Sequence, residues 1–219
     1  MRMADLLATN PNLILVLPRL GIPLGFAERT VEQVCAAADV STDFLLLICN
    51  SYTFPGFEPD PRSITSQDIH SLISYLKASH HYYTHQRLPH ISRHLLHVSQ
   101  GSEERYRNIL MKFFEDYCTQ VSAHFQEEET ELLPRLLTNT SSGPQTKPTL
   151  LVSSHQDLHN TLDDFIQILY KYIPSNEPTE EFFEMVSCLI QLSYDLQHHS
   201  YIEEMILMPL LKLTEGGSL

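Results

Sequence analysis

The sequence predicts an all-α protein, in which an up-down-up-down four-helix bundle follows a small helical N-terminal domain. Glycine is scarce, with 7 among 219 residues, and tryptophan is absent, so long helices fit the chain better than a turn-rich β architecture. Apolar residues recur at helical spacing along four long segments after about residue 60. Short connections join these segments, so consecutive helices are expected to be antiparallel neighbours.

The composition of the chain argues against some kinds of binding partner. A chain of 219 residues is long enough for one bundle and one small module, and its 42% apolar and 19% charged residues are ordinary for a globular protein. The formal net charge of −13 argues against nucleic acid, because phosphate contacts need clustered Lys and Arg. It also disfavours an anionic membrane surface. We therefore expect neither a nucleic acid nor a membrane as partner.

The cysteines and the apolar runs indicate a compartment. The four cysteines form no C-x-x-C pair and no disulfide-like framework, which is typical of free thiols in a reducing environment. No run approaches the roughly 18 apolar residues of a membrane span, and the N-terminus lacks a signal-peptide pattern. The sequence therefore predicts a cytoplasmic protein.

Residues 1–60 are predicted to form the small helical domain and its linker. Thr30-Val-Glu-Gln33 matches a capping box at the start of one helix, and Ser41 can cap the next. The Pro-rich stretch 54–62 then places a domain boundary near residue 60. Because so small a unit can barely sustain its own core, we expect it to pack on the rest of the chain or on a second copy, in a homodimer.

Residues 61–219 are predicted to form the bundle. The expected helices cover about residues 65–99, 103–137, 149–173 and 179–213. They are separated by Gly101-Ser102, by the polar region 138–148 and by the proline-bounded stretch 174–178. The apolar stripe of the first helix is Ile69, Leu72, Ile73 and Leu76, and that of the third is Leu151, Leu158, Leu162, Phe165, Leu169 and Ile173.

Two short motifs carry the chemistry. His124 precedes Glu128 by four residues, and His199 precedes Glu203 by four, so each pair lies on one helix face, one turn apart. Both pairs fall within apolar seams, where ionisable groups are costly unless a partner satisfies them. The repeated spacing indicates a shared partner, and a metal is the best candidate. The two seams are Leu110, Phe114, Tyr117, Val121, His124, Glu128, Leu132 and Leu189, Leu192, Leu196, His199, Glu203, Ile206, Leu210.

The other two helices add histidines at a similar level. The third helix carries His155 in its seam and His159 four residues later, while the first carries His80, His81 and His85. At about 1.5 Å per residue along antiparallel helices, these clusters are expected at one height. Mixed His and carboxylate ligation suits non-haem iron, although Mn or Zn would also accept it. The absence of clustered thiolates disfavours a structural zinc site or an Fe–S cluster.

Some histidines are expected to be ordinary surface residues. His90, His94 and His97 lie beside Arg87 and Arg93 near a helix end, which is typical of a solvated face. In the first helix, the phase set by its apolar stripe places His80 nearer the centre of the buried face than His81, so spacing alone leaves the choice between them open.

The motifs, taken in order, resemble hemerythrin-like domains, and more closely the di-iron proteins called repair of iron centres, or RIC. The resemblance rests on His81 with Leu88-Pro89, His124-Phe-Gln-Glu-Glu128 with Leu133-Pro134, His155, and His199-Ser-Tyr-Ile-Glu203 with Met208-Pro209. It implies two iron ions joined by an oxo or hydroxo bridge. The implied terminal ligands are His81, His124, His155 and His199, and the implied bridging ligands are Glu128 and Glu203. The distance to Leu88-Pro89 makes the resemblance favour His81 over His80.

Two departures from the family pattern stand out. The first fifty residues resemble the small domain often found before such bundles, through Leu20-Gly-Ile and Thr30-Val-Glu-Gln, but this chain has Leu24-Gly25 where that domain carries adjacent cysteines. Chemistry that depends on a vicinal thiol pair is therefore not expected. Ser154 also stands where the family tends to have a glutamate.

The resemblance implies a cytoplasmic non-haem di-iron protein of RIC type, active in nitrosative or oxidative stress. It would react with nitric oxide or oxygen, or supply iron to damaged iron–sulfur proteins. The alternative is a hemerythrin-like protein that binds or senses O2 or NO without turnover, and a third reading is a scaffold holding zinc or manganese. No nucleophile and base of the hydrolytic kind stand out, so the sequence leaves open whether the protein is an enzyme.

Overall fold

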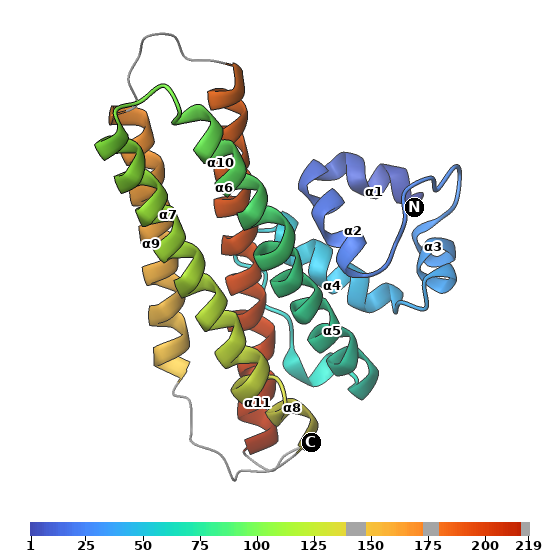
Figure 1. Ribbon diagram of the computed structural model, residues 1–219. Coiled ribbons are helices and arrows are strands. Elements are labelled where there is room, and N and C mark those ends of the chain that lie inside the picture. The colour runs from blue at the N-terminus through green and yellow to red at the C-terminus, as the bar shows by residue number, and fades with distance from the viewer. Residues whose placement is uncertain (139–147, 173–179, 216–219) are drawn as a thin grey trace. The chain divides into compact units, whose positions relative to one another are not determined.

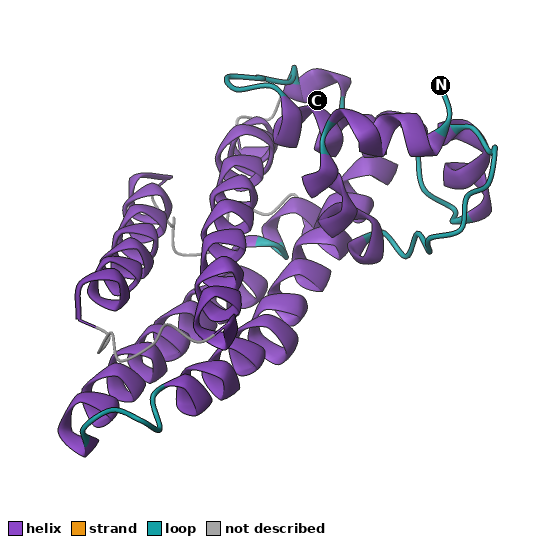
Figure 2. Ribbon diagram, turned by 90° about the horizontal axis from the view of Figure 1, so that it is seen from above, coloured by secondary structure: helices purple, strands orange, loops and turns teal. Residues whose placement is uncertain are grey.

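The computed structural model describes residues 1–138, 148–172 and 180–215, and these residues form helices joined by turns and loops. No strand occurs within the described ranges (Figure 2), and an isolated bridge joins Arg2 to Thr30. The predicted all-α class is therefore confirmed. Most of the polar region predicted at 138–148, and all of the turn at 174–178, lie outside the described residues.

The chain divides into two compact units. The first comprises Met1–Ser79, Arg135–Ser142 and His198–Leu219, and the second comprises His80–Pro134 and Gly143–Gln197. The division falls within two long helices. The boundary that the sequence predicts near residue 60 lies inside the first unit, and the separate domain 1–60 stays a prediction.

The N-terminal region of the first unit consists of short helices whose starts are capped as the sequence predicts. Thr30 and Gln33 exchange both hydrogen bonds of a capping box, and Ser41 accepts from the N–H of Phe44. At Gly21 the backbone has a φ of +66°, which the missing Cβ permits. The elements are α1 (Met3–Thr9), η1 (Pro11–Leu15), α2 (Val16–Arg19), α3 (Val31–Ala37), α4 (Thr42–Thr53) and η2 (Pro61–Ser63).

A buried polar chain runs through the first unit. The Arg19 guanidinium donates to the Tyr52 hydroxyl at 3.2 Å, and the hydroxyls of Tyr52 and Tyr75 lie 3.3 Å apart. The Tyr52 ring stacks on His198, with 4.6 Å between ring centroids. Because buried polar groups are costly when unpaired, this network fixes one arrangement of the aromatic side chains around α4.

No described helix is by itself long and apolar enough to cross a membrane. The pair α3 and α4 passes the length and composition test together, with a bend of 117° between its two helices.

The four long helical segments appear where the sequence predicts them, to within a few residues. Thr65 caps the first through Asp68, whose N–H donates to its hydroxyl at 3.2 Å. The elements are α5 (Ser66–Tyr82), η3 (Tyr83–Arg87), α6 (Leu88–Val98), α7 (Glu104–Glu127), η4 (Glu128–Leu132), α8 (Arg135–Thr138), α9 (Pro148–Tyr172), α10 (Glu180–Ile202), η5 (Glu203–Leu207) and α11 (Met208–Glu215).

Three of these segments widen into a π-helical stretch just before a proline. The stretches η3, η4 and η5 each precede an apolar residue followed by proline: Leu88-Pro89, Leu133-Pro134 and Met208-Pro209. In an α-helix the proline ring would clash with the carbonyl four residues earlier, and the missing N–H would break the ladder. The wider π turn accommodates the ring, because the residue before each proline donates instead to the carbonyl five residues earlier.

The core of the second unit lies among η3, α6, α7, α9 and α10 (Figure 1). The members of both predicted seams are buried or nearly so, including the ionisable ones. The members of the second seam from His199 onward belong to the first unit. Phe165 of α9 lies at the centre, 5.3 Å from Phe113 and 5.4 Å from Phe114 between ring centroids. Aromatic packing of this kind accounts for much of the stability of a small helical core.

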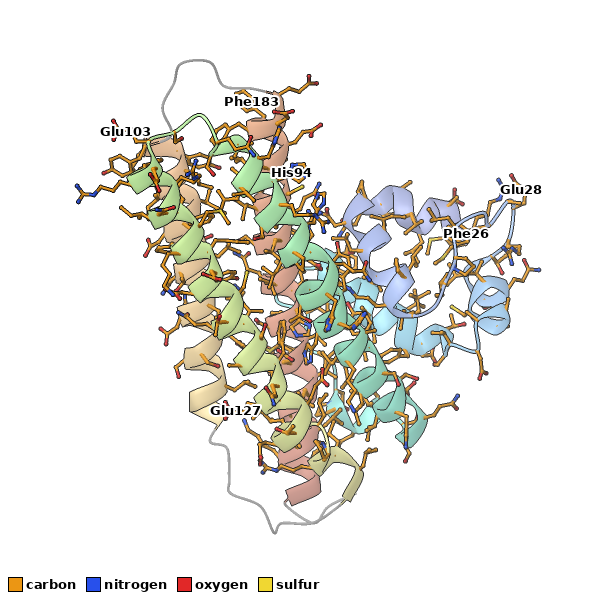
Figure 3. All side chains as sticks on the ribbon, viewed as in Figure 1. Phe26, Glu28, His94, Glu103, Glu127 and Phe183 are labelled. Carbon is orange, nitrogen blue, oxygen red and sulfur yellow. The ribbon has the colours of Figure 1, made fainter. Side chains whose placement is uncertain are left out.

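The central position of Phe165 gives a stability prediction. We expect Phe165→Ala to lower the free energy of unfolding by about 3–5 kcal/mol, because it opens a cavity in a close-packed core. The matched control is Phe183→Ala, since Phe183 is 59% exposed at the start of α10 (Figure 3) and its loss should change stability by no more than about 0.5 kcal/mol. Urea denaturation of both variants measures the difference. Equal effects would show that this core is not packed as described.

Candidate metal centre

The second unit buries one carboxylate among three imidazoles. Glu128, the first residue of η4, is 1% exposed. Its Oε1 lies 3.0 Å from Nε2 of His124 and 3.4 Å from Nε2 of His155, and its Oε2 lies 3.4 Å from Nε2 of His80. Ligand atoms of His124, Glu128 and His155 all lie within 4.8 Å of one another, so this group could hold a metal ion.

Three helices bring these side chains together. The spacing of four puts His124 one turn before Glu128 on the buried face of α7, as the sequence predicts. His155 comes from α9, which packs along α7, and its ring meets that of His124 edge-on at 5.0 Å. His80 comes from the end of α5 and stacks on the ring of Phe125 at 4.2 Å. The neighbouring rings hold all three imidazoles in place.

A serine contacts the far nitrogen of His124. Nδ1 of His124 lies 3.3 Å from Oγ of Ser154, and that hydroxyl donates to the carbonyl of Leu151 at 2.8 Å. Ser154 can therefore accept a proton from Nδ1, and in that tautomer Nε2 of His124 would be the atom that binds a metal ion.

A second carboxylate contacts the far nitrogen of His80. Nδ1 of His80 lies 2.9 Å from Oε1 of Glu129, a carboxylate that accepts, so Nδ1 is the donor of this contact. Nε2 of His80 lies 3.4 Å from Oε2 of Glu128. That oxygen is buried and accepts no hydrogen bond from any described residue.

This arrangement suits a metal ion. Imidazole nitrogens and carboxylate oxygens that converge in a buried site are ligands that iron, manganese and zinc accept. Ligating histidines characteristically donate their other N–H to a carboxylate or hydroxyl, and Glu129 and Ser154 occupy those positions beside His80 and His124. The two oxygens of Glu128 face different imidazoles, which is the arrangement that a carboxylate bridging two metal ions needs.

The first unit holds the second predicted pair. Nε2 of His199 lies 3.1 Å from Oε1 of Glu203, the first residue of η5, and both side chains are buried. The pair repeats the geometry of His124 and Glu128, including a carboxylate at the start of a π stretch. The prediction that both pairs serve the same two irons stays a prediction.

His81 is not where the resemblance puts it. Its side chain is exposed and stacks on His85, with 4.3 Å between ring centroids. His80 occupies the buried position instead, and the phase of the apolar stripe on α5 explains why: Leu72, Ile73 and Leu76 are buried on that same face. The structure therefore favours His80 over His81 for this position, and the ligand itself stays a prediction.

Glu129 is the contact that the sequence did not reveal. It follows Glu128 directly in the run Glu127-Glu128-Glu129, and its 38% exposed side chain nevertheless reaches His80. Ser154 was seen only as a departure from the family pattern, yet it orients His124. The spacing of residues along the sequence does not predict either contact, because each joins side chains from two different helices.

The cysteines take no part in this site. Burial raises the pKa of Cys49 to about 12 and that of Cys118 to about 11, and it also raises the pKa of Cys35. These thiols stay protonated at neutral pH and are poor metal ligands.

Comparisons with known proteins do not show which family the chain belongs to. The sequence matches no model of a protein family, and no curated protein matches it.

Substitutions of two neighbouring glutamates test whether Glu128 is a metal ligand. We expect Glu128→Gln to lose most bound metal, because a neutral amide cannot balance cations among three imidazoles. Glu127→Gln is the matched control, since Glu127 is exposed on the last turn of α7 (Figure 3) and should keep its metal. Metal content after anaerobic reconstitution distinguishes them. Full metal content in Glu128→Gln would remove this residue from the ligand set.

A second pair of variants decides between the adjacent histidines. We expect His80→Ala to lower metal content or weaken metal affinity at least about tenfold, while His81→Ala leaves both unchanged. Competition with a chromogenic chelator measures the affinity. The opposite result, with loss only in His81→Ala, would restore the assignment that the resemblance favours.

Proposed function

We propose that the protein is a non-haem di-iron protein of hemerythrin-like, RIC type, with an up-down-up-down four-helix bundle behind a small N-terminal domain. It would act in the cytoplasm under nitrosative or oxidative stress, reacting with nitric oxide or oxygen or supplying iron to damaged iron–sulfur proteins. The ligands are His80, His124, His155 and Glu128, together with the predicted pair His199 and Glu203.

The observation that carries the proposal is the buried Glu128 carboxylate with imidazole nitrogens on both of its oxygens. Mixed imidazole and carboxylate ligation favours iron, manganese or zinc over calcium or magnesium. Six protein ligands cannot saturate two octahedral ions, so positions remain for an oxo or hydroxo bridge and for a diatomic ligand. The resemblance in the order of the motifs favours iron among these metals.

Bound iron supplies redox change and open coordination positions. The protein residues supply the rest. Ser154 and Glu129 contact the Nδ1 atoms of His124 and His80, and the Nε2 atoms of both imidazoles face Glu128, where a metal ion would bind. The Phe125 ring covers the face of His80 and keeps water away from it. A dry, rigid set of ligands stabilises a reactive metal pair against loss and side reactions.

Reversible binding of O2 or NO, without turnover, is the second candidate. It is favoured by the N-terminal residues, because Leu24-Gly25 replaces the adjacent cysteines of the related small domain, and Leu24 is exposed. Cys35 is buried with a raised pKa, so it does not substitute for a reactive thiol pair. On this reading the N-terminal residues serve as an interaction surface, for a second copy or for a client protein.

Nitric oxide consumption by the reduced, iron-loaded protein tests the first candidate against the second. Catalytic turnover predicts many equivalents of NO consumed per chain in the presence of a reductant. Reversible binding predicts that uptake stops at about the number of iron sites and that the gas is recovered on purging. The Glu128→Gln protein is the control for both, because it should neither consume nor bind NO beyond the free-iron background. If the native protein behaves like this control, both candidates fail.

A further inference from the structure

A histidine stripe on α6 has no role in the proposed centre. His90, His94 and His97 are spaced by four and three residues, which places them along one face of the helix. The rings of His90 and His94 lie 4.4 Å apart between centroids and are tilted by 53°. His94 projects from the side of α6 (Figure 3), and His97 is 60% exposed.

Two imidazoles one helical turn apart form a chelate for a divalent transition ion. Their side chains project in the same direction, so two ring nitrogens can reach one ion, and imidazole is a preferred ligand of Cu²⁺, Ni²⁺ and Zn²⁺. Hard cations such as Mg²⁺ and Ca²⁺ need oxygen ligands, which this pair lacks. Burial, followed by the nearby His94, Arg87 and Arg93, lowers the pKa of His90.

The charges around the pair are partly compensated. Arg87 donates to the carbonyl of Cys188 at 3.1 Å and to the side chain of Gln191 at 2.7 Å, which holds its guanidinium against α10. Glu181 of α10 lies 3.4 Å from Nε2 of His97 and brings a negative charge to the end of the stripe. The stripe therefore carries a carboxylate at its His97 end as well as the arginines near His90.

We infer that His90 and His94 form a surface site for a divalent transition metal ion of the Zn²⁺ or Cu²⁺ kind, separate from the buried centre. None of its ligands belongs to the proposed di-metal set, so the inference does not depend on the proposed function. By the order of stability of divalent complexes, Cu²⁺ binds this site more tightly than Zn²⁺, and Mg²⁺ does not compete.

Zinc titration of the full chain tests the site. Zn²⁺ is added to the native protein and to His94→Gln in competition with a chromogenic chelator. We expect the native chain to bind one more equivalent than the variant at the same chelator strength, because losing one arm of a chelate weakens binding by about a hundredfold. His90→Gln should lose the same equivalent. The stacked pair His81 and His85 can also take zinc, so only the difference between proteins counts.

His70→Gln is the matched control, because His70 is exposed on α5 with its Nδ1 on the carbonyl of Ser66. It should bind as much zinc as the native chain. Iron content after reconstitution should be equal in all four proteins, which separates this test from that of the buried centre. The inference is overturned if His94→Gln or His90→Gln binds as many equivalents as the native chain, or if excess Mg²⁺ abolishes the difference.

Discussion

The second unit depends on a buried carboxylate with imidazole nitrogens beside both of its oxygens. Glu128 is buried at the start of η4, and Ser154 and Glu129 contact the Nδ1 atoms of His124 and His80, whose Nε2 atoms face that carboxylate. Ionisable groups in a core that is otherwise apolar are costly unless a partner satisfies them. With a bound cation, the same contacts would become a ligand set whose orientation is already fixed. We therefore regard the polar residues of the core as a binding site that the surrounding aromatic packing maintains.

The backbone contributes through its prolines. Each of the three π stretches begins at the residue whose carbonyl accepts the hydrogen bond from the position before proline, and these residues are Tyr83, Glu128 and Glu203. In two of the three, that residue is the buried carboxylate of a His-Glu pair. The third is a buried tyrosine, whose hydroxyl donates to the carbonyl of Asp195. The same local backbone feature thus recurs along the chain, and its first residue is acidic in the two cases where a histidine precedes it by four residues. π stretches are frequent at functional sites, and here they coincide with the candidate ligands.

Much of this could be predicted from sequence because it depends on short-range periodicity. Helix positions, the caps at Thr30 and Ser41, and the burial of His124, His155, Glu128, His199 and Glu203 all follow from spacing and phase. The same phase favoured His80, which is buried, whereas the distance to Leu88-Pro89 favoured His81, which is exposed. The π stretches were not foreseen, although a proline inside each helix was a signal for them. The contacts of Glu129 and Ser154 join residues far apart in the chain, and no local pattern encodes them.

The most direct measurement is the metal content and ultraviolet-visible spectrum of the full chain, purified under reducing conditions at low oxygen. We expect two irons per chain and oxo-bridged charge-transfer bands after exposure to air. If the protein holds only zinc or manganese and the same residues are required to bind it, the site is a metal centre but the di-iron chemistry is rejected. A chain that takes up no metal after reconstitution would contradict the central claim that the buried histidines and Glu128 form a metal site.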